Sequence, residues 1–179
     1  MSIQIRPVSP EDWPQIMAIQ AECYHQLSPE PLSVMRNKAE LAPQSCWVGE
    51  VRGVVLGYLL CHPWRTHQPP PLSQPMMALA GEEEFYLHDL AVSARARGQG
   101  MGQALLDQAL SHASRSGYTR LGLVAVQDAP AFWLRQGFTP AHTLKSLAEY
   151  GDGALYMERR INDGPSACAA LTSVPMSNR

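Results

Sequence analysis

"SARARGQGMGQALL", residues 93–106, sets two arginines and three glycines directly before a segment with the apolar spacing of a helix. A glycine inside a helix costs about 1 kcal/mol relative to alanine, so three of them, at positions 98, 100 and 102, indicate that the backbone must stay accessible there. A glycine-rich turn that opens a helix directs the unpaired N–H groups of the first turn toward one point, where the helix dipole adds about half a positive charge. The stretch therefore predicts an anion-binding loop, with Arg95 and Arg97 as additional donors.

Two other phosphate-binding loops do not fit this stretch. A P-loop requires a Lys-Ser or Lys-Thr pair after its last glycine, and no such pair follows Gly102. A dinucleotide fingerprint requires G-x-G-x-x-G with an acidic residue about twenty positions further on. The spacing here is G-x-G-x-G, and Asp128, at the end of the next strand-like run, comes about thirty positions later. Nucleotide-dependent redox chemistry is therefore the least favoured interpretation.

Length and composition favour a single domain. The chain has 179 residues, of which 45% are hydrophobic and 17% charged, and this is enough to bury one sizeable core. We expect the domain to span residues 1–161, and residues 162–179, rich in Ser, Pro and Ala, to form a flexible C-terminal tail. A net charge of −2 at pH 7 gives no general attraction to nucleic acid or to an anionic membrane.

The cysteines and the N-terminus indicate a reducing compartment. The four cysteines show neither C-x-x-C pairs nor the spacing of zinc sites, so we expect reduced thiols and no metal at Cys23, Cys46, Cys61 and Cys168. The N-terminus lacks the basic start and long apolar stretch of a signal peptide, and VVLGYLLC at 54–61 is too short to span a bilayer. These features predict a cytoplasmic protein.

Hydrophobic periodicity predicts a mixed α/β fold, with helices on both faces of a mixed sheet. Strands are expected over residues 3–8, 45–51, 54–61, 84–92, 120–126, from 138, and over 154–161. Helices are expected over residues 10–24, 33–41, from the glycine loop to about 116, and over 129–136. Residues 62–83 hold five prolines in their first fourteen positions and predict a long loop, of a size that is often functional.

Two separated motifs and the element order resemble one family. The pattern Arg97-x-x-Gly100-x-Gly102 is similar to the Arg/Gln-x-x-Gly-x-Gly/Ala signature of the Gcn5-related N-acetyltransferases, the GNAT superfamily. The preceding YLHDLAV resembles the family's fourth strand, and AFWLRQGF at 131–138 resembles its later helix-to-strand segment. The resemblance covers about residues 3–161 and implies the GNAT fold, whose central mixed sheet is mostly antiparallel.

The resemblance also implies acetyl-CoA as the co-substrate and an amine as the acceptor. The pyrophosphate would rest on the loop formed by Arg97, Gly98, Gln99, Gly100, Met101 and Gly102. The pantetheine arm would pair with backbone groups of Leu90, Ala91 and Val92, because its amides behave like those of an added strand.

For catalysis, the resemblance points to the strand over residues 84–92. A backbone N–H, that of Leu90, suits the oxyanion. Strand alternation puts Glu84 and His88 on the face of Leu90, opposite an apolar face interrupted by one aspartate: Phe85, Leu87, Asp89 and Ala91. Glu84 lies thirteen positions before Arg97, where several family members carry their general base, so it is our first candidate, acting through a water. His88 is the second, because imidazole titrates near pH 6.5.

Simpler interpretations of both residues stay open. Glu84 ends a run of three glutamates, which is more typical of a solvated loop edge, and His88 can serve as a hydrogen-bonding group within the sheet. The family's acid tyrosine falls on Trp133, whose indole N–H is no acid at neutral pH. The thiolate must then leave unassisted or through water, or the Tyr150 hydroxyl must serve; Trp133 can still pack on the pantetheine.

The acceptor is expected between the first two helices and residues 62–83. Tyr24, His25, Trp64 and the glutamates near position 83 are candidate wall residues, and such aromatic rings and carboxylates favour a cationic amine. The leading interpretation is an N-acetyltransferase that acts by direct attack in a ternary complex. The alternative is a non-catalytic acyl-CoA-binding module of the same fold. Family members often form homodimers, and nothing in the sequence decides this.

Overall fold

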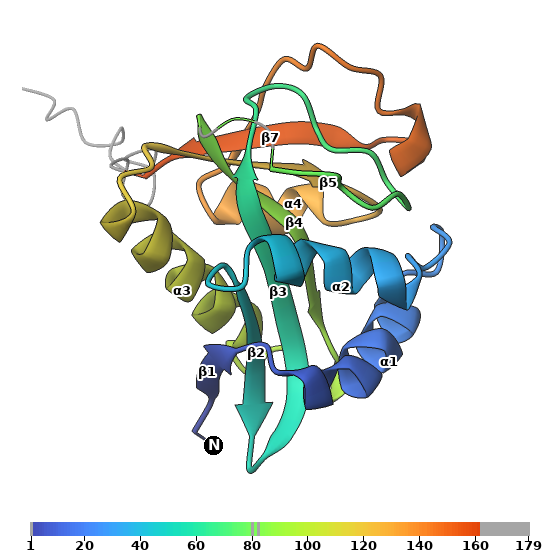
Figure 1. Cartoon of the computed structure of the whole chain (residues 1–179), viewed down its shortest axis with the longest axis vertical. Coiled ribbons are helices and arrows are strands. Elements are labelled where there is room, and N and C mark those ends of the chain that lie inside the picture. Colours follow the sequence, from blue (N-terminus) through green and yellow to red (C-terminus); the bar gives the residue numbers. More distant parts are fainter. Residues whose placement is uncertain (1, 80, 82, 162–179) are drawn as a thin grey trace, which may run out of the picture.

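The computed structural model of the chain describes residues 2–79, 81 and 83–161. Its centre is a seven-stranded sheet in the order β1-β2-β3-β4-β5-β7-β6 (Figure 1). The strands are β1 (Gln4–Pro7), β2 (Cys46–Val51), β3 (Val54–Trp64), β4 (Glu84–Val92), β5 (Arg120–Ala125), β6 (Thr139–Pro140) and β7 (Leu155–Arg160). Neighbouring strands are antiparallel except β4 and β5, which are parallel, so the expected mixed, mostly antiparallel sheet is confirmed. The predicted tail over residues 162–179, with Cys168, lies outside the described residues.

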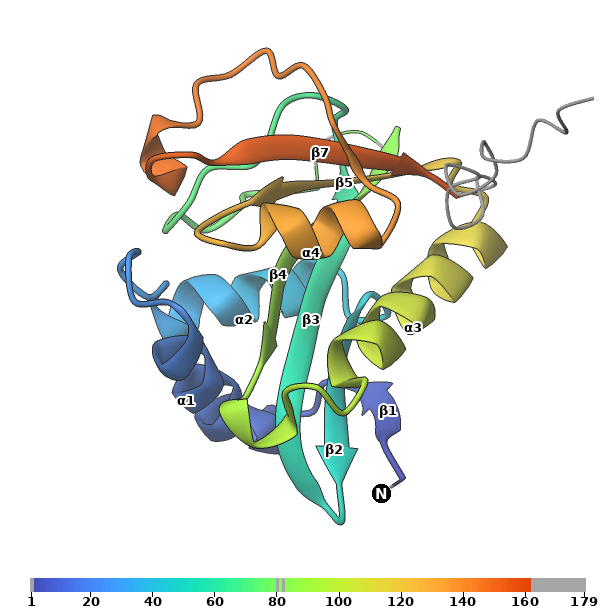
Figure 2. The ribbon, with the colours of Figure 1, turned by 180° about the vertical axis from the view of Figure 1, so that it is seen from behind.

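Helices cover both faces of the sheet, as expected. On one face lie α1 (Trp13–Cys23) and α2 (Leu32–Leu41), where Ile16, Ile19 and Met35 belong to the first of two cores. On the other face α3 (Met101–Arg115) and α4 (Pro130–Arg135) close the second core over Leu105 and Phe138 (Figure 2). None of the helices in the part of the chain that the structure describes is long and apolar enough to cross a membrane.

The tight turn between β2 and β3 follows from Arg52-Gly53, whose φ angles of 52° and 76° are typical of a two-residue hairpin turn. β3 is longer than predicted, because residues up to Trp64 pair with the first residues of β4. The loop expected over residues 62–83 therefore begins after Trp64.

β4 contains a bulge that sequence alternation could not predict. Leu60 of β3 pairs with Asp89, but the next β3 residue, Cys61, pairs with Leu87, so His88 is an extra residue on β4. The bulge reverses the side-chain alternation: Leu87 packs in the core under α3, whereas Ala91 packs in the core under α1. The predicted faces are therefore wrong beyond His88. Leu90 does not share the face of Glu84 and His88, and Asp89 points to the α1 side.

β4 and β5 separate soon after they meet. Only two parallel pairs join them among the described residues, Phe85 with Leu121 and Tyr86 with Gly122. From Leu87 to the 3-10 turn η2 (Ala94–Ala96), the edge of β4 that faces β5 has no paired strand. The sheet therefore opens into a V between β4 and β5 (Figure 2).

The segment after β3 is fastened across the α2 face by hydrogen bonds. The Asn37 side chain binds both backbone groups of Met76, at 2.7 and 3.1 Å. The Tyr150 hydroxyl, at the end of the 3-10 turn η3 (Ala148–Tyr150), donates to the Pro70 carbonyl at 2.5 Å. Residues 65–79 are therefore anchored at Pro70 and Met76, and Leu72 and Ser73 between these anchors line the cavity described below.

Candidate active site

The opening between β4 and β5 leads into a cavity of about 1200 Å³. Its lining comes from β4, the glycine loop, the end of β5, α4, the connection between α1 and α2, and two outer segments at Leu72–Ser73 and Glu149–Tyr150. Of the predicted cofactor residues, nine line it: Leu90, Ala91, Val92, Arg97, Gly98, Gly100, Met101, Gly102 and Trp133. The tenth, Gln99, does not, since its side-chain amide donates to the Arg95 carbonyl.

The backbone of β4 presents hydrogen-bonding groups to this cavity. The Ser93 N–H donates to the Leu56 carbonyl of β3 at 2.8 Å, and backbone groups alternate in direction along a strand. Ala91 therefore also faces β3, while the N–H and carbonyl groups of Leu90 and Val92 face the cavity. Among the three predicted pantetheine contacts, Ala91 is thus corrected: its backbone is used within the sheet, and only its side-chain position borders the cavity.

The glycine loop has the conformation that glycine is needed for. Gly98 and Gly100 have φ angles of 73° and 84°, in the left-handed region, and a side chain at either would project into open space. Gly100 is the N-cap of α3, so the first N–H groups of the helix lack intrahelical partners and face outward. Arg97 is exposed beside the loop and lines the cavity, whereas Arg95 does not. The Met101 side chain is buried in the core, which leaves only its backbone for a ligand.

Trp133 forms part of the cavity wall. Its ring is buried in edge contacts with Phe132 and Phe138, with centroid distances of 5.0 and 5.2 Å. Tyr150, the other predicted source of an acid, also lines the cavity. Burial raises the pKa of the Tyr150 hydroxyl, which donates to Pro70. The Trp133 indole is no acid at neutral pH, and the Tyr150 proton is already donated to the Pro70 carbonyl.

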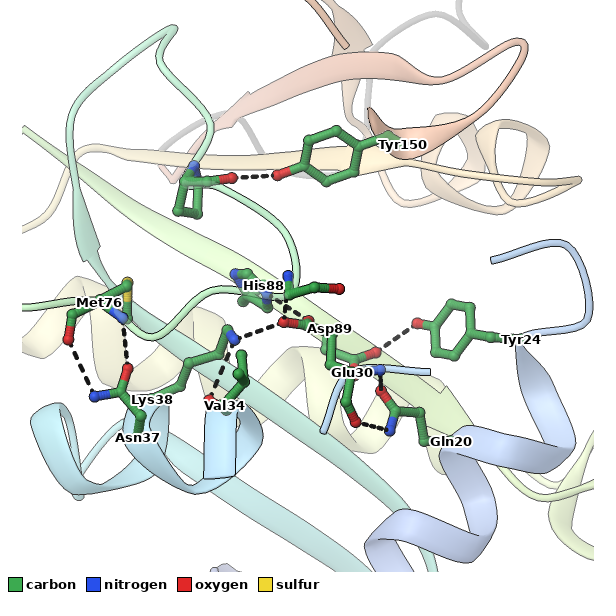
Figure 3. A network of polar contacts seen from close by, with 12 residues as sticks. Gln20, Tyr24, Glu30, Val34, Asn37, Lys38, Met76, His88, Asp89 and Tyr150 are labelled. Atoms are coloured by element: carbon green, nitrogen blue, oxygen red, sulfur yellow. Dashed lines mark hydrogen bonds and ion pairs between the residues drawn. The ribbon is translucent and has the colours of Figure 1, made fainter. Parts of the chain in front are cut away.

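A buried polar network lies under the α1–α2 connection (Figure 3). Glu30 is its centre: one carboxylate oxygen is 3.0 Å from Lys38 Nζ and accepts from the Ser73 N–H at 3.1 Å, and the other is 3.1 Å from His88 Nε2. Burial alone would raise the pKa of Glu30, but the hydrogen bond from His88 and the Lys38 charge outweigh it and lower the pKa to about 2. Gln20 completes the network through two bonds to the Glu30 backbone.

His88 is held with its free nitrogen inside the protein. Burial lowers the pKa of His88, against the opposing effect of Glu30, so the neutral ring donates its Nε2–H to Glu30. The other nitrogen, Nδ1, is buried without a hydrogen-bond partner among the described residues. The ring lies beside His62, with centroids 5.6 Å apart, and its side chain is 1% exposed. His88 therefore borders the cavity but does not offer it a proton-accepting atom.

Asp89 lies next to His88 and points toward α1. The Tyr24 hydroxyl donates to Asp89 Oδ1 at 2.5 Å, and the Tyr58 hydroxyl donates to Oδ2 at 2.7 Å. Burial raises the pKa of Asp89 to about 6, although both hydrogen bonds oppose the rise. Tyr24 and Asp89 line the cavity, whereas Tyr58 is fully buried behind them.

Glu84, the first predicted base, lies outside the cavity lining. Its side chain is buried over the backbone of Gly122, where a β-carbon would overlap its carboxylate, and Oε2 accepts from the Tyr156 hydroxyl at 2.5 Å. Burial raises the pKa of Glu84 to about 7. The structure therefore places this carboxyl group at the narrow end of the opening, against β5 and β7.

Of the residues predicted to surround the acceptor amine, the structure brings only some together. Tyr24 and His25 line the cavity. Trp64 instead borders a separate hollow of about 430 Å³, and Glu83 accepts from the Thr66 N–H. The sequence reasoning missed Glu30, because a glutamate between two prolines carries no signal of burial. Lys38 was missed as well, since its position within the expected helix resembles a solvated one.

Metal-ligating side chains do not gather at this site: across residues 2–79, 81 and 83–161 there is no group of three or more that could hold a metal ion.

Comparisons with solved structures place the fold. Ard1 from Thermoplasma volcanium superposes with a TM-score of 0.70 at 21% identity, covering 89% of this chain and 98% of that one. The ribosomal-protein-S18-alanine N-acetyltransferase from Escherichia coli gives 0.65 at 16%, with 89% and 94% covered. N-acetylglutamate synthase from Neisseria gonorrhoeae, solved with coenzyme A and N-acetyl-glutamate, gives 0.64 at 18%, with 90% and 35% covered. A comparison with curated proteins found no match.

The sequence itself supplies the stronger assignment. The sequence model of the Acetyltransferase (GNAT) family matches residues 13–138 of this chain. These residues run from the start of α1 to the end of the AFWLRQGF motif. This range includes the bulged β4, the glycine loop and α3. Because the match covers more than half of the sequence, the chain belongs to the Acetyltransferase (GNAT) family.

Proposed function

We propose that this protein transfers an acetyl group from acetyl-CoA to a primary amine by direct attack in a ternary complex. Members of the GNAT family are generally acyltransferases. The observation that carries the proposal is a continuous cavity in which the free backbone edge of β4 leads into the glycine loop at the start of α3. This combination suits a ligand with a peptide-like arm and a diphosphate.

The pantetheine arm would lie along β4 and use the outward backbone groups of Leu90 and Val92. The Val92 carbonyl accepts a weak hydrogen bond from Cys23 Sγ at 3.3 Å and keeps a second lone pair, and the Leu90 carbonyl oxygen lies 3.4 Å from the Tyr24 hydroxyl oxygen, whose proton is donated to Asp89. The diphosphate would rest on the N–H groups of Gly98, Gly100, Met101 and Gly102, with Arg97 nearby, whereas the Gln99 N–H donates to the Ala96 carbonyl. Trp133 would pack against the arm.

The thioester would then lie near the bulge. The Leu90 N–H points into the cavity there and is our candidate for stabilising the tetrahedral oxyanion. Since Trp133 is no acid, the thiol would leave as its thiolate, whose ordinary pKa of about 8.5 makes it a fair leaving group near neutral pH. The acceptor amine would enter from the side of the α1–α2 connection and residues 72–73.

A binding module without catalysis is the second candidate. The burial of His88 Nδ1 and the position of Glu84 outside the cavity favour it, because both predicted bases lack access to an acceptor. Such a protein would bind acetyl-CoA through the same backbone groups and transfer nothing.

Two measurements decide between these functions. A ligand at a hundredfold its Kd stabilises a protein by about 2.7 kcal/mol, which raises the Tm of a domain of this size by about 5–10 °C. We expect acetyl-CoA to give such a shift and NADH to give none. No shift at millimolar acetyl-CoA would refute both functions. A panel of primary amines with thiol detection then separates them, because only the enzyme releases CoA in proportion to acetylated amine.

A further inference from the structure

Resting on the acyl transfer proposed above, we propose that Tyr24 is a catalytic residue of this site and passes the proton of the attacking amine to Asp89. The Tyr24 hydroxyl oxygen would accept the amine proton while its own proton moves along the existing hydrogen bond to the Asp89 carboxylate. The two side chains come from different elements, Tyr24 from the C-terminal end of α1 and Asp89 from the bulged part of β4.

The pair is already connected. The Tyr24 hydroxyl is 2.5 Å from Asp89 Oδ1, a short hydrogen bond along which a proton moves with little displacement of heavy atoms. A phenol that donates one bond keeps lone pairs to accept another. Because Tyr24 lines the cavity, we place the acceptor amine where it approaches those lone pairs.

The pair also lies where the chemistry must occur. The Tyr24 hydroxyl is 3.4 Å from the Leu90 carbonyl oxygen, on the edge of β4 from which the Leu90 N–H projects. An amine that attacks a thioester held by that N–H would approach from the α1 side, next to Tyr24. Figure 3 shows Tyr24 pointing from the end of α1 toward Asp89.

Tyr58 holds the far side of the relay. Its hydroxyl donates to Asp89 Oδ2 at 2.7 Å, and its ring is fully buried in the core under α1. With Tyr24 on one oxygen and Tyr58 on the other, the carboxylate is fixed in orientation. The bulge at His88 makes this possible, because without it Asp89 would point to the other face of the sheet.

The surroundings of Asp89 leave it able to take up a proton. Burial is the dominant influence on its pKa, and Tyr24 and Tyr58 oppose it by hydrogen bonding. From the connection after α1, Glu30 raises the pKa of Asp89, and from α2 the Lys38 charge lowers it. The result, about 6, leaves the group mostly ionised at neutral pH yet basic enough to hold a proton briefly.

The step balances without a further reactant. The amine nitrogen forms a bond to the acetyl carbon, and the carbon–sulfur bond breaks, with its electron pair leaving on sulfur as the CoA thiolate. The nitrogen loses one proton to Tyr24, and Tyr24 loses one to Asp89. Asp89 returns its proton through Tyr24 to the thiolate or to water when the products leave.

Three variants test the relay, with 1,4-diaminobutane as the probe amine. Tyr24→Phe removes only the hydroxyl, and we expect kcat to fall by about 10²-fold or more, as loss of general base catalysis does, with the Kd of acetyl-CoA within about threefold. Tyr58→Phe is the matched control: it also removes one phenol from Asp89 but does not border the cavity, and its kcat should fall by less than about tenfold. Equal losses in the two variants would overturn the proposal, as would wild-type kcat in Tyr24→Phe.

The pH profile gives a readout that a structural role would not move. Protonation of the amine gives log(kcat/KM) a slope of about one, and protonation of Asp89 should raise the slope to about two below about pH 6. In Asp89→Asn the steeper part of the profile, with a slope of about two, should vanish. In Tyr58→Phe it should begin at a higher pH, because the hydrogen bond from Tyr58 lowers the pKa of Asp89. A wild-type profile without the steeper part would overturn the relay while leaving the acyl transfer intact. Loss of acetyl-CoA binding in the wild type would instead overturn the proposed function.

Discussion

Glu84→Gln should stabilise the protein at neutral and alkaline pH. Burial raises the pKa of Glu84 to about 7 from an ordinary value of 4.5, so the folded state holds the proton more tightly than the unfolded chain does. The free energy of unfolding therefore falls as pH rises from about 4.5 to 7, by about 3.4 kcal/mol at 1.36 kcal/mol per unit of pKa. About 2.5 kcal/mol of this lies between pH 5 and 8. Glutamine does not titrate, and its amide oxygen still accepts from Tyr156.

The assay is urea unfolding, followed by tryptophan fluorescence, of the wild type and Glu84→Gln at pH 5, 6.5 and 8. Comparison of the two proteins removes the contribution of Asp89, which is common to both. We expect the stability difference to shift by about 2.5 kcal/mol in favour of the variant between pH 5 and 8. A constant difference for Glu84→Gln would refute the reasoning. The proposed acetyl transfer should survive this substitution, because Glu84 lies outside the cavity lining.

Three further substitutions test other parts of the structure. Gly100→Ala forces a side chain into a φ of 84°, and calorimetry should show acetyl-CoA binding weakened about tenfold. Gly117→Ala is the control, because its φ of 83° lies at the far end of α3: it should lose as much stability as Gly100→Ala and keep the affinity for acetyl-CoA. Lys38→Met leaves a buried carboxylate without its cation and should lower the free energy of unfolding by about 3–5 kcal/mol in urea. Asn37→Ala removes two bonds to Met76 and should speed hydrogen exchange over residues 65–79; unchanged exchange would contradict the anchoring of this segment by Asn37.

The fold was accessible from the sequence where local chemistry decides it. The strand over residues 84–92 has the predicted bounds, since its apolar pattern ends at a glycine-rich turn. The hairpin followed from Arg52-Gly53 and the helices from their apolar spacing. α1 begins at Trp13, three residues later than expected, because the 3-10 turn η1 (Pro10–Asp12) precedes it.

The site was less accessible, because long-range pairing decides it. Alternation along β4 predicts a common face for Glu84 and Leu90, and the extra residue at His88 reverses it. No local pattern marks a bulge that is defined by the partner strand. Burial likewise depends on tertiary contacts: Glu30 and Asp89 become candidate functional groups only when α1, α2 and β4 come together.

The gap between β4 and β5 has a consequence for motion. Among the described residues, one short parallel ladder is the only strand pairing that joins β5, β7 and β6 to the rest of the sheet, and side-chain bonds such as those of Tyr156 to Glu84 and of Tyr150 to Pro70 add to it. A ligand bound in the gap would contact both halves of the sheet and hold them together. Hydrogen exchange should therefore slow in β7 as well as in β4 when the ligand binds.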